Sequence, residues 1–193
     1  MTKNIEAQVL IVGGGPVGLT LATDLAQRGI SVIVAETRHR GEPPSVKCNH
    51  VSSRTMEIFR RLGVSKAMRE AGLPADHAND VSYRTTFTGE ELSRIHIPSR
   101  ASRYTDKSGP DGWWPTAEPP HRINQIYLEP VLFAHAEATK GVTILSRTRI
   151  DEFTQDEHGV NAKGVDLESG QEVRVFSQYM IGCDGGRSAV RKA

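Results

Sequence analysis

Residues 8–18 read Gln-Val-Leu-Ile-Val-Gly-Gly-Gly-Pro-Val-Gly, an apolar run followed directly by glycines. The apolar part, residues 8–12, predicts a short buried strand, and the glycines predict a turn that opens a helix. Gly13, Gly15 and Gly18 have the spacing G-x-G-x-x-G. The first permits a tight turn, the second lets a diphosphate approach the backbone, and the third lets the helix pack closely on the strand. The pattern therefore predicts a phosphate-binding turn at a helix N-terminus, where free amides and the helix dipole favour an anion.

The residues after this turn complete a strand–helix–strand unit. Residues 17–28 have apolar side chains at helical spacing, and Gly29 stands where a helix end favours a left-handed residue. A second buried strand is predicted over residues 31–35, ending at Glu36. Two such strands around a helix predict a right-handed crossover and a parallel pair. The apolar positions of the helix are Val17, Leu21 and Leu25.

Glu36 stands at the carboxyl end of the second predicted strand. A carboxylate there accepts hydrogen bonds from a ribose diol and repels a 2′-phosphate, so the unit predicts the ADP half of FAD or NAD rather than NADP. FAD and NAD share that half, and the unit alone does not separate them. The predicted cofactor contacts in this unit are Gly13, Gly15, Pro16, Val17, Gly18 and Glu36.

The rest of the chain contains further predicted helices and strands. Helices are predicted at residues 54–62, 65–71 and 125–140. Strands are predicted at residues 142–154, 160–167, 171–176 and 178–182. Ser53 is the expected N-cap of the first of these helices, and Pro130 is tolerable only in the first turn of the third. A final helix is expected to begin at Ser188.

Residues 80–120 interrupt this pattern with strand-like segments and a long loop. The predicted fold class is α/β: a Rossmann-like FAD-binding domain, with a parallel sheet and a β meander, into which part of a β-rich substrate domain is inserted. Tyr83, Arg84, Trp113 and Trp114 lie in this insertion, either as packing and loop anchors or as pocket walls. The predicted segments are 1–79 and 121–193 for the FAD-binding domain and 80–120 for the partial substrate domain.

A second signal lies in residues 179–191, Tyr-Met-Ile-Gly-Cys-Asp-Gly-Gly-Arg-Ser-Ala-Val-Arg. Asp184 follows a strand and precedes glycines, at the place where open α/β sheets bind ligands. Alone, the pattern also fits a strand-to-helix turn with a solvated aspartate. Together with the first turn, it makes the chain resemble the N-terminal part of the class A flavoprotein aromatic hydroxylases, the para-hydroxybenzoate and phenol hydroxylase family. The resemblance covers essentially the whole chain and depends on residues 13–36, 47–63, 124–132 and 183–191.

The resemblance implies an FAD-dependent monooxygenase that uses NAD(P)H and O₂ to hydroxylate a small aromatic, phenolic substrate. It implies that Gln125 bonds the phosphate–ribityl region of the cofactor and that Asp184 is the acid of the family's Asp-Gly motif. Lys47 stands near a cofactor-binding arginine of many members, and Arg38 is expected either to flank the adenosine or to be a solvated loop residue. The cofactor supplies the chemistry, so no catalytic acid or base is predicted.

One motif of that family has no counterpart here. The family uses a Gly-Asp pair to close over the riboflavin half of FAD, and no Gly-Asp pair occurs in this sequence. Truncation accounts for this better than divergence, so the chain is expected to be the front part of a longer protein. By itself it is expected to retain FAD weakly or not at all.

Composition excludes several classes of partner. The 24 Lys+Arg residues balance 23 Asp+Glu residues without a basic stripe, which disfavours nucleic acid and anionic membranes. The longest aliphatic run, residues 9–12, is too short to span a bilayer, and no secretory signal is visible, so a cytoplasmic location is expected. Cys48 and Cys183 are expected to be reduced thiols, and no metal-ligand spacing occurs. A homodimer is compatible with the sequence.

Two other classes of function stay open. Another flavin-dependent oxidoreductase of the same fold, such as a reductase or halogenase, would share both motifs. A non-catalytic module would bind ADP or FAD at a site dependent on Glu36 without turnover. An NAD-dependent dehydrogenase is disfavoured, because residues 142–182 predict a β meander rather than further βαβ repeats.

Overall fold

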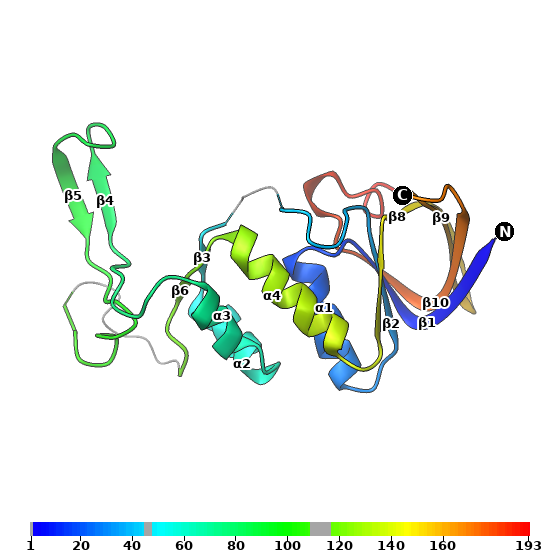
Figure 1. The fold of residues 1–193 in the computed structure, drawn as a ribbon, viewed down its shortest axis with the longest axis horizontal. Helices are drawn as coiled ribbons and strands as arrows, with labels where there is room; N and C mark the ends of the chain where they lie inside the picture. The colour runs from blue at the N-terminus through cyan, green and yellow to red at the C-terminus, as the bar shows by residue number, and fades with distance from the viewer. Residues whose placement is uncertain (1, 45–47, 109–116) are drawn as a thin grey trace. The chain divides into compact units, whose positions relative to one another are not determined.

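The computed structural model describes three stretches of the chain: residues 2–44, 48–108 and 117–193 (Figure 1). By their contacts, the residues form two compact units: Met1–Ser45 with Glu129–Ala193, and Val46–Leu128. The predicted boundaries at residues 80 and 120 separate FAD-binding segments from a substrate segment by their expected function, not by their contacts. They stay a prediction.

The first unit is built on a six-stranded sheet with the order β7-β2-β1-β10-β9-β8. Its strands are β1 (Lys3–Val12), β2 (Val32–Glu36), β7 (Val142–Ser146), β8 (Thr148–Asp156), β9 (Gly159–Asp166) and β10 (Glu172–Gly182). β7, β2, β1 and β10 are parallel, whereas β9 pairs antiparallel with both β10 and β8. This arrangement confirms the predicted α/β fold with a parallel sheet and a β meander.

Helix α1 (Pro16–Gln27) packs on one face of this sheet, and its left-handed end at Gly29 (φ +84°) is as predicted. The side chains beneath it include Val9, Ile11 and Val34, because alternate strand residues point to the same face. The predicted apolar stripe of α1 is only partly correct. Val17 is 70% exposed, whereas Leu21 and Leu25 are partly buried against the core. The buried residues of α1 are Gly18, Leu19, Ala22, Thr23 and Ala26.

Several strand boundaries differ from the prediction, and β1 begins at Lys3 rather than at residue 8. The segment 142–154 is divided at Arg147, whose φ of 57° ends β7 beside β2 and allows β8 to turn toward β9. The segments 171–176 and 178–182 are one strand, β10, because it pairs with β1 in a single register from Lys3 to Val12. Pairing along the whole length of β1 therefore overrides the weak break predicted between them.

Within its described residues, the second unit contains two complete helices, the start of a third and two small antiparallel strand pairs. The helices are α2 (Ser53–Arg61) and α3 (Ser65–Ala71), and the strand pairs are β3 (His50–Val51) with β6 (His121–Arg122) and β4 (Val81–Arg84) with β5 (Glu91–Ile95). The predicted bounds of α3 are confirmed. The N-cap of α2 is Ser52 rather than Ser53, since the Ser52 hydroxyl accepts a hydrogen bond from the Thr55 amide at 3.3 Å.

Helix α4 (Gln125–Ala138) contains Pro130 in its interior. The expectation that Pro130 requires a place in the first turn is therefore wrong. A proline at this position removes one hydrogen bond, the one that would run to the carbonyl of Ile126. The remaining turns keep the helix intact despite this loss.

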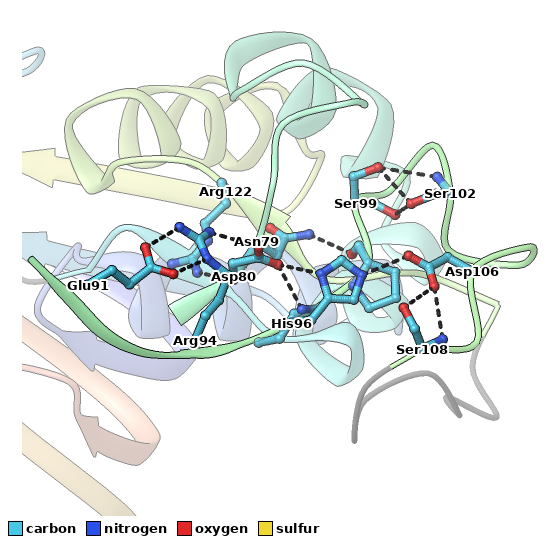
Figure 2. A network of polar contacts seen from close by, with 12 residues as sticks. Asn79, Asp80, Glu91, Arg94, His96, Ser99, Ser102, Asp106, Ser108 and Arg122 are labelled. Carbon is cyan, nitrogen blue, oxygen red and sulfur yellow. Dashed lines mark hydrogen bonds and ion pairs between the residues drawn. The ribbon is translucent and has the colours of Figure 1, made fainter. Parts of the chain in front are cut away.

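Polar contacts hold the base of the exposed β4–β5 hairpin (Figure 2). Arg94 pairs with Asp80 at 2.9 Å and with Glu91 at 2.6 Å. The His96 ring lies between two carboxylates, with Nδ1 3.1 Å from Asp80 and Nε2 2.8 Å from Asp106. The two ring nitrogens can donate at the same time only in the imidazolium form, so protonation of His96 favours this arrangement.

This arrangement predicts a pH-dependent contribution to stability. The hydrogen bond to Asp106 and the charge of Asp80 raise the pKa of His96 above its usual 6.5. A group whose pKa is raised on folding contributes its full stabilisation below its pKa in the unfolded chain. That stabilisation is lost as the pH rises through its pKa in the folded protein. We expect His96→Gln to lower the melting temperature more at pH 6 than at pH 9. Thermal unfolding at both pH values checks this, with the exposed His77→Gln as control. An equal loss at both would contradict it.

Candidate dinucleotide-binding site

The glycine turn is closed by backbone contacts that exclude side chains. The Gly13 amide donates to the Ala35 carbonyl at 2.8 Å, which ties the turn to the end of β2. Gly13 has a φ of +108°, and a Cβ there would lie 2.4 Å from the Cys183 carbonyl oxygen. A Cβ at Gly18 would lie 2.0 Å from the carbonyl oxygen of Gly13. These two glycines are therefore required by the close packing of helix, turn and strands.

Gly15 differs, because no atom lies within 4 Å of the place of a Cβ. It is the N-cap of α1, in an extended conformation, and Pro16 follows at the first helical position. The first amides of a helix have no partner within the helix, and proline lacks the N–H that would be unsatisfied. Val17, also in this turn, is exposed. Open space at the N-terminus of a helix of 12 residues fits the predicted diphosphate.

Glu36 ends β2 and is buried beside the turn, with 8% of its surface exposed. Its Oε2 accepts from the Gly14 amide at 2.7 Å, and its Oε1 accepts from the Arg38 amide at 2.9 Å. Burial alone would raise the pKa of Glu36, but hydrogen bonds and charge from Arg38, with the Gly14 amide, outweigh it and lower the pKa below 4.5. Glu36 is therefore an ionised acceptor at neutral pH.

Arg38 lies between two buried carboxylates. Its guanidinium donates to Glu36 through Nε at 3.2 Å and Nη2 at 3.3 Å, and Nη2 also pairs with Glu129 of α4. A pocket of about 30 Å³ beside them is lined by Gly14, Glu36, Arg38, Glu129 and Phe133, among others. Glu129 is not among the cofactor-binding residues predicted from the sequence. An acid in the otherwise apolar run from Leu128 to Leu132 is the signal that could have indicated one.

Asp184 lies next to the glycine turn, at the carboxyl end of β10. The Cys183 amide donates to the Val12 carbonyl at 2.7 Å, which holds this segment against the end of β1. Asp184 Oδ2 accepts from the Ala189 amide at 2.7 Å. Its Oδ1 is buried and has no hydrogen-bond partner among the described residues. A buried acceptor without a partner fits a ligand hydroxyl or amide at this point.

The predicted helix after Asp184 is not formed. Residues 185–187 form a single 3₁₀ turn, and residues 190–192 form a further turn. Ser188 nevertheless makes the predicted kind of contact, because its hydroxyl accepts from the Arg191 amide at 3.0 Å. The capping signal is therefore correct locally, although no α-helix follows it within the described residues.

The other predicted residues belong to the second unit or lie outside the described residues. Gln125 begins α4, in the second unit, and its amide donates to the Cys48 carbonyl at 3.0 Å. Lys47, Trp113 and Trp114 lie outside the described residues. Tyr83 and Arg84 belong to the exposed β4–β5 hairpin, where Arg84 pairs with Glu91 at 2.9 Å. The residues that the structure brings together are Gly13, Gly15, Pro16, Val17, Gly18, Glu36, Arg38 and Asp184.

The second unit has a hollow of its own, which no sequence pattern predicted. It measures about 640 Å³ and is lined by Asn49, Gly72, Arg122, Asn124 and Tyr127, among others. Within the described residues, no helix has the length and apolar character needed to cross a bilayer. The same residues contain no cluster of three or more His, Cys, Asp or Glu side chains suited to a metal ion.

Known proteins share this chain's sequence and fold. Tetracenomycin B2 monooxygenase-dioxygenase of Streptomyces olivaceus is 33% identical, over 98% of this chain and 36% of its own length. Phenol 2-monooxygenase of Pseudomonas sp. (strain EST1001) is 33% identical, over 98% of this chain and 30% of its own length. The crystal structure of the flavin-dependent monooxygenase PieE with FAD and substrate matches 97% of this chain and 32% of that chain, with 32% identity and a TM-score of 0.84.

The chain therefore spans about a third of the length of these relatives. Their similarity confirms the resemblance to flavoprotein aromatic hydroxylases. The family described as FAD binding domain matches residues 6–193, which include the glycine turn, Glu36 and Asp184. Both the match and the geometry of the turn lead to one assignment: the chain belongs to the FAD-binding domain family.

Proposed function

We propose that this chain binds the ADP half of FAD at the glycine turn of a monooxygenase that hydroxylates an aromatic, phenolic substrate with O₂ and NAD(P)H. The observation that supports binding most directly is the open space at Gly15, in front of α1, beside the ionised carboxylate of Glu36. The reaction is supported by relatives that are named as monooxygenases. When bound, FAD would supply the redox chemistry and the activation of O₂.

The residues of the chain then bind and orient the cofactor. Amides of Val17 and Gly18 face the diphosphate, and Glu36 accepts from the adenosine ribose. The free Oδ1 of Asp184 accepts from a further donor of the cofactor. Arg38 flanks the adenosine. By the resemblance, Lys47 and Gln125 are proposed contacts as well, and residues 80–120 are proposed as part of the substrate domain.

The absorption spectrum of the intact protein tests this proposal. We expect bound flavin, its reduction by NAD(P)H, and faster NAD(P)H consumption with a phenol that is hydroxylated. Bound flavin that NAD(P)H does not reduce would contradict the proposed monooxygenase activity and favour a non-catalytic module. Absence of flavin binding at any FAD concentration would contradict both.

Glu36→Gln tests the binding site itself. A hydrogen bond to a charged group contributes about 1.5–3 kcal/mol, so the loss of charge should weaken FAD binding roughly ten- to a hundredfold. Titration of the apoprotein with FAD measures this. Glu42→Gln is the matched control, because Glu42 lines the same pocket but is exposed. Equal affinities of Glu36→Gln and the unaltered protein would refute the ribose contact.

A further inference from the structure

Glu36 is already saturated with hydrogen-bond donors. Its two oxygens accept from the Gly14 amide, from the amide and guanidinium of Arg38, and from the Thr37 hydroxyl at 3.3 Å. The adjoining pocket measures only about 30 Å³. A ribose that bonds Glu36 must therefore replace donors that Arg38 now supplies.

Glu129 provides the other partner of Arg38. Only 7% of the Glu129 side chain and 10% of the Glu36 side chain are exposed, so both carboxylates act on the guanidinium with little screening by water. When a ribose takes over Glu36, Arg38 keeps a buried counter-ion. The position and charge of Arg38 are thus set from α4 as well as from β2.

An arginine beside the ribose-binding acid is also the group that accommodates a 2′-phosphate in NADP sites. Arg38 has the chain position and the cationic donors for that task, and Glu129 neutralises it. Glu42, the other carboxylate lining the pocket, is exposed and its charge is more strongly screened. We infer that Glu129 determines the specificity of the site for the ribose: by pairing with Arg38, it makes the site reject a 2′-phosphorylated ribose. This inference rests on the proposed binding of an ADP group at Glu36.

Competition between two nucleotides tests the inference. ADP-ribose and 2′-phospho-ADP-ribose compete with FAD for the apoprotein of the intact protein, and flavin fluorescence reports the displacement. The unaltered protein should prefer ADP-ribose. Glu129→Gln should reduce that preference roughly tenfold, because one buried charge no longer opposes the dianionic phosphate and Arg38 gains a free donor face. The change should come from tighter binding of 2′-phospho-ADP-ribose, with ADP-ribose affinity nearly unchanged.

Further variants separate this effect from a structural one. Glu137 lies on the same helix as Glu129 and pairs with the exposed Arg40 at 2.5 Å. Glu137→Gln should leave the preference for ADP-ribose unchanged. The double variant Arg38→Gln with Glu129→Gln should restore the preference for ADP-ribose, because it lacks the guanidinium that Glu129→Gln alone leaves unpaired with Glu129. Glu129→Met removes the same charge at similar volume and replaces Glu129→Gln if that variant does not fold by circular dichroism.

The outcomes distinguish the two claims. An unchanged preference in the Glu129 variants, or an equal loss of both affinities, would overturn the inference while leaving the proposed site in place. Failure of ADP-ribose to displace FAD from the unaltered protein would overturn the proposed site at Glu36, and the inference with it. A preference that falls in Glu129→Gln and returns in the double variant supports both.

Discussion

Replacing Gly15 with aspartate should abolish FAD binding and leave the fold intact. The Gly15 backbone is extended, with a φ of −77°, and a Cβ there meets nothing within 4 Å. Aspartate is also a favoured N-cap residue, so the free energy of unfolding should stay within about 0.5 kcal/mol or rise slightly. The carboxylate would face the diphosphate directly. Unit charges about 4 Å apart near a protein surface repel by about 4 kcal/mol, so FAD affinity should fall by more than about a hundredfold.

Gly15→Asn separates charge from size in this test. Asparagine has nearly the shape of aspartate and is an equally good N-cap, but it is neutral. We expect it to weaken FAD binding by roughly tenfold, through bulk alone. Denaturant unfolding measures the stability of both variants, and titration of the apoprotein measures FAD affinity. An aspartate variant that folds normally and still binds FAD tightly would place the diphosphate elsewhere.

The parts of the site that the sequence predicted are those whose constraints are local. Gly13 and Gly18 are dictated by backbone contacts within the turn and with the adjoining strand end, and any helix that opens there needs them. Glu36 follows from its place at the end of a buried strand. Gly29 ends α1 with a positive φ for the same local reason.

The parts that the sequence did not predict depend on pairing between distant segments. β10 continues through a weak strand signal because β1 pairs with it along its length. Arg147 divides β7 from β8 because the two strands have different partners, β2 and β9. The contact of Arg38 with Glu129 joins residues far apart in the chain, and no spacing rule indicates it. Val17 was assigned to the packed face of α1 from the helical spacing of apolar residues alone, although it lies in the exposed first turn.

Replacing Arg38 with methionine should destabilise the fold more than any other single charge removal near this site. Methionine keeps much of the volume but leaves Glu36 and Glu129 buried without their shared cation. Removing one member of a buried ion pair costs about 3–5 kcal/mol. About a quarter of the Arg38 side chain is exposed, so we expect about 2–3 kcal/mol at pH 7 by denaturant unfolding.

The pH dependence of that loss shows whether charge is its cause. In the unaltered protein the pKa of Glu36 is lowered, so its contribution is present above 4.5 and is lost as the pH falls through the folded value. Without Arg38, burial raises the pKa of Glu36, and its protonation removes the buried negative charge. The deficit of Arg38→Met relative to the unaltered protein should therefore shrink from pH 7 to pH 5. Arg40→Met, which breaks the exposed pair with Glu137, should change stability little at either pH. A deficit of equal size at both pH values would instead indicate lost packing of the arginine stem.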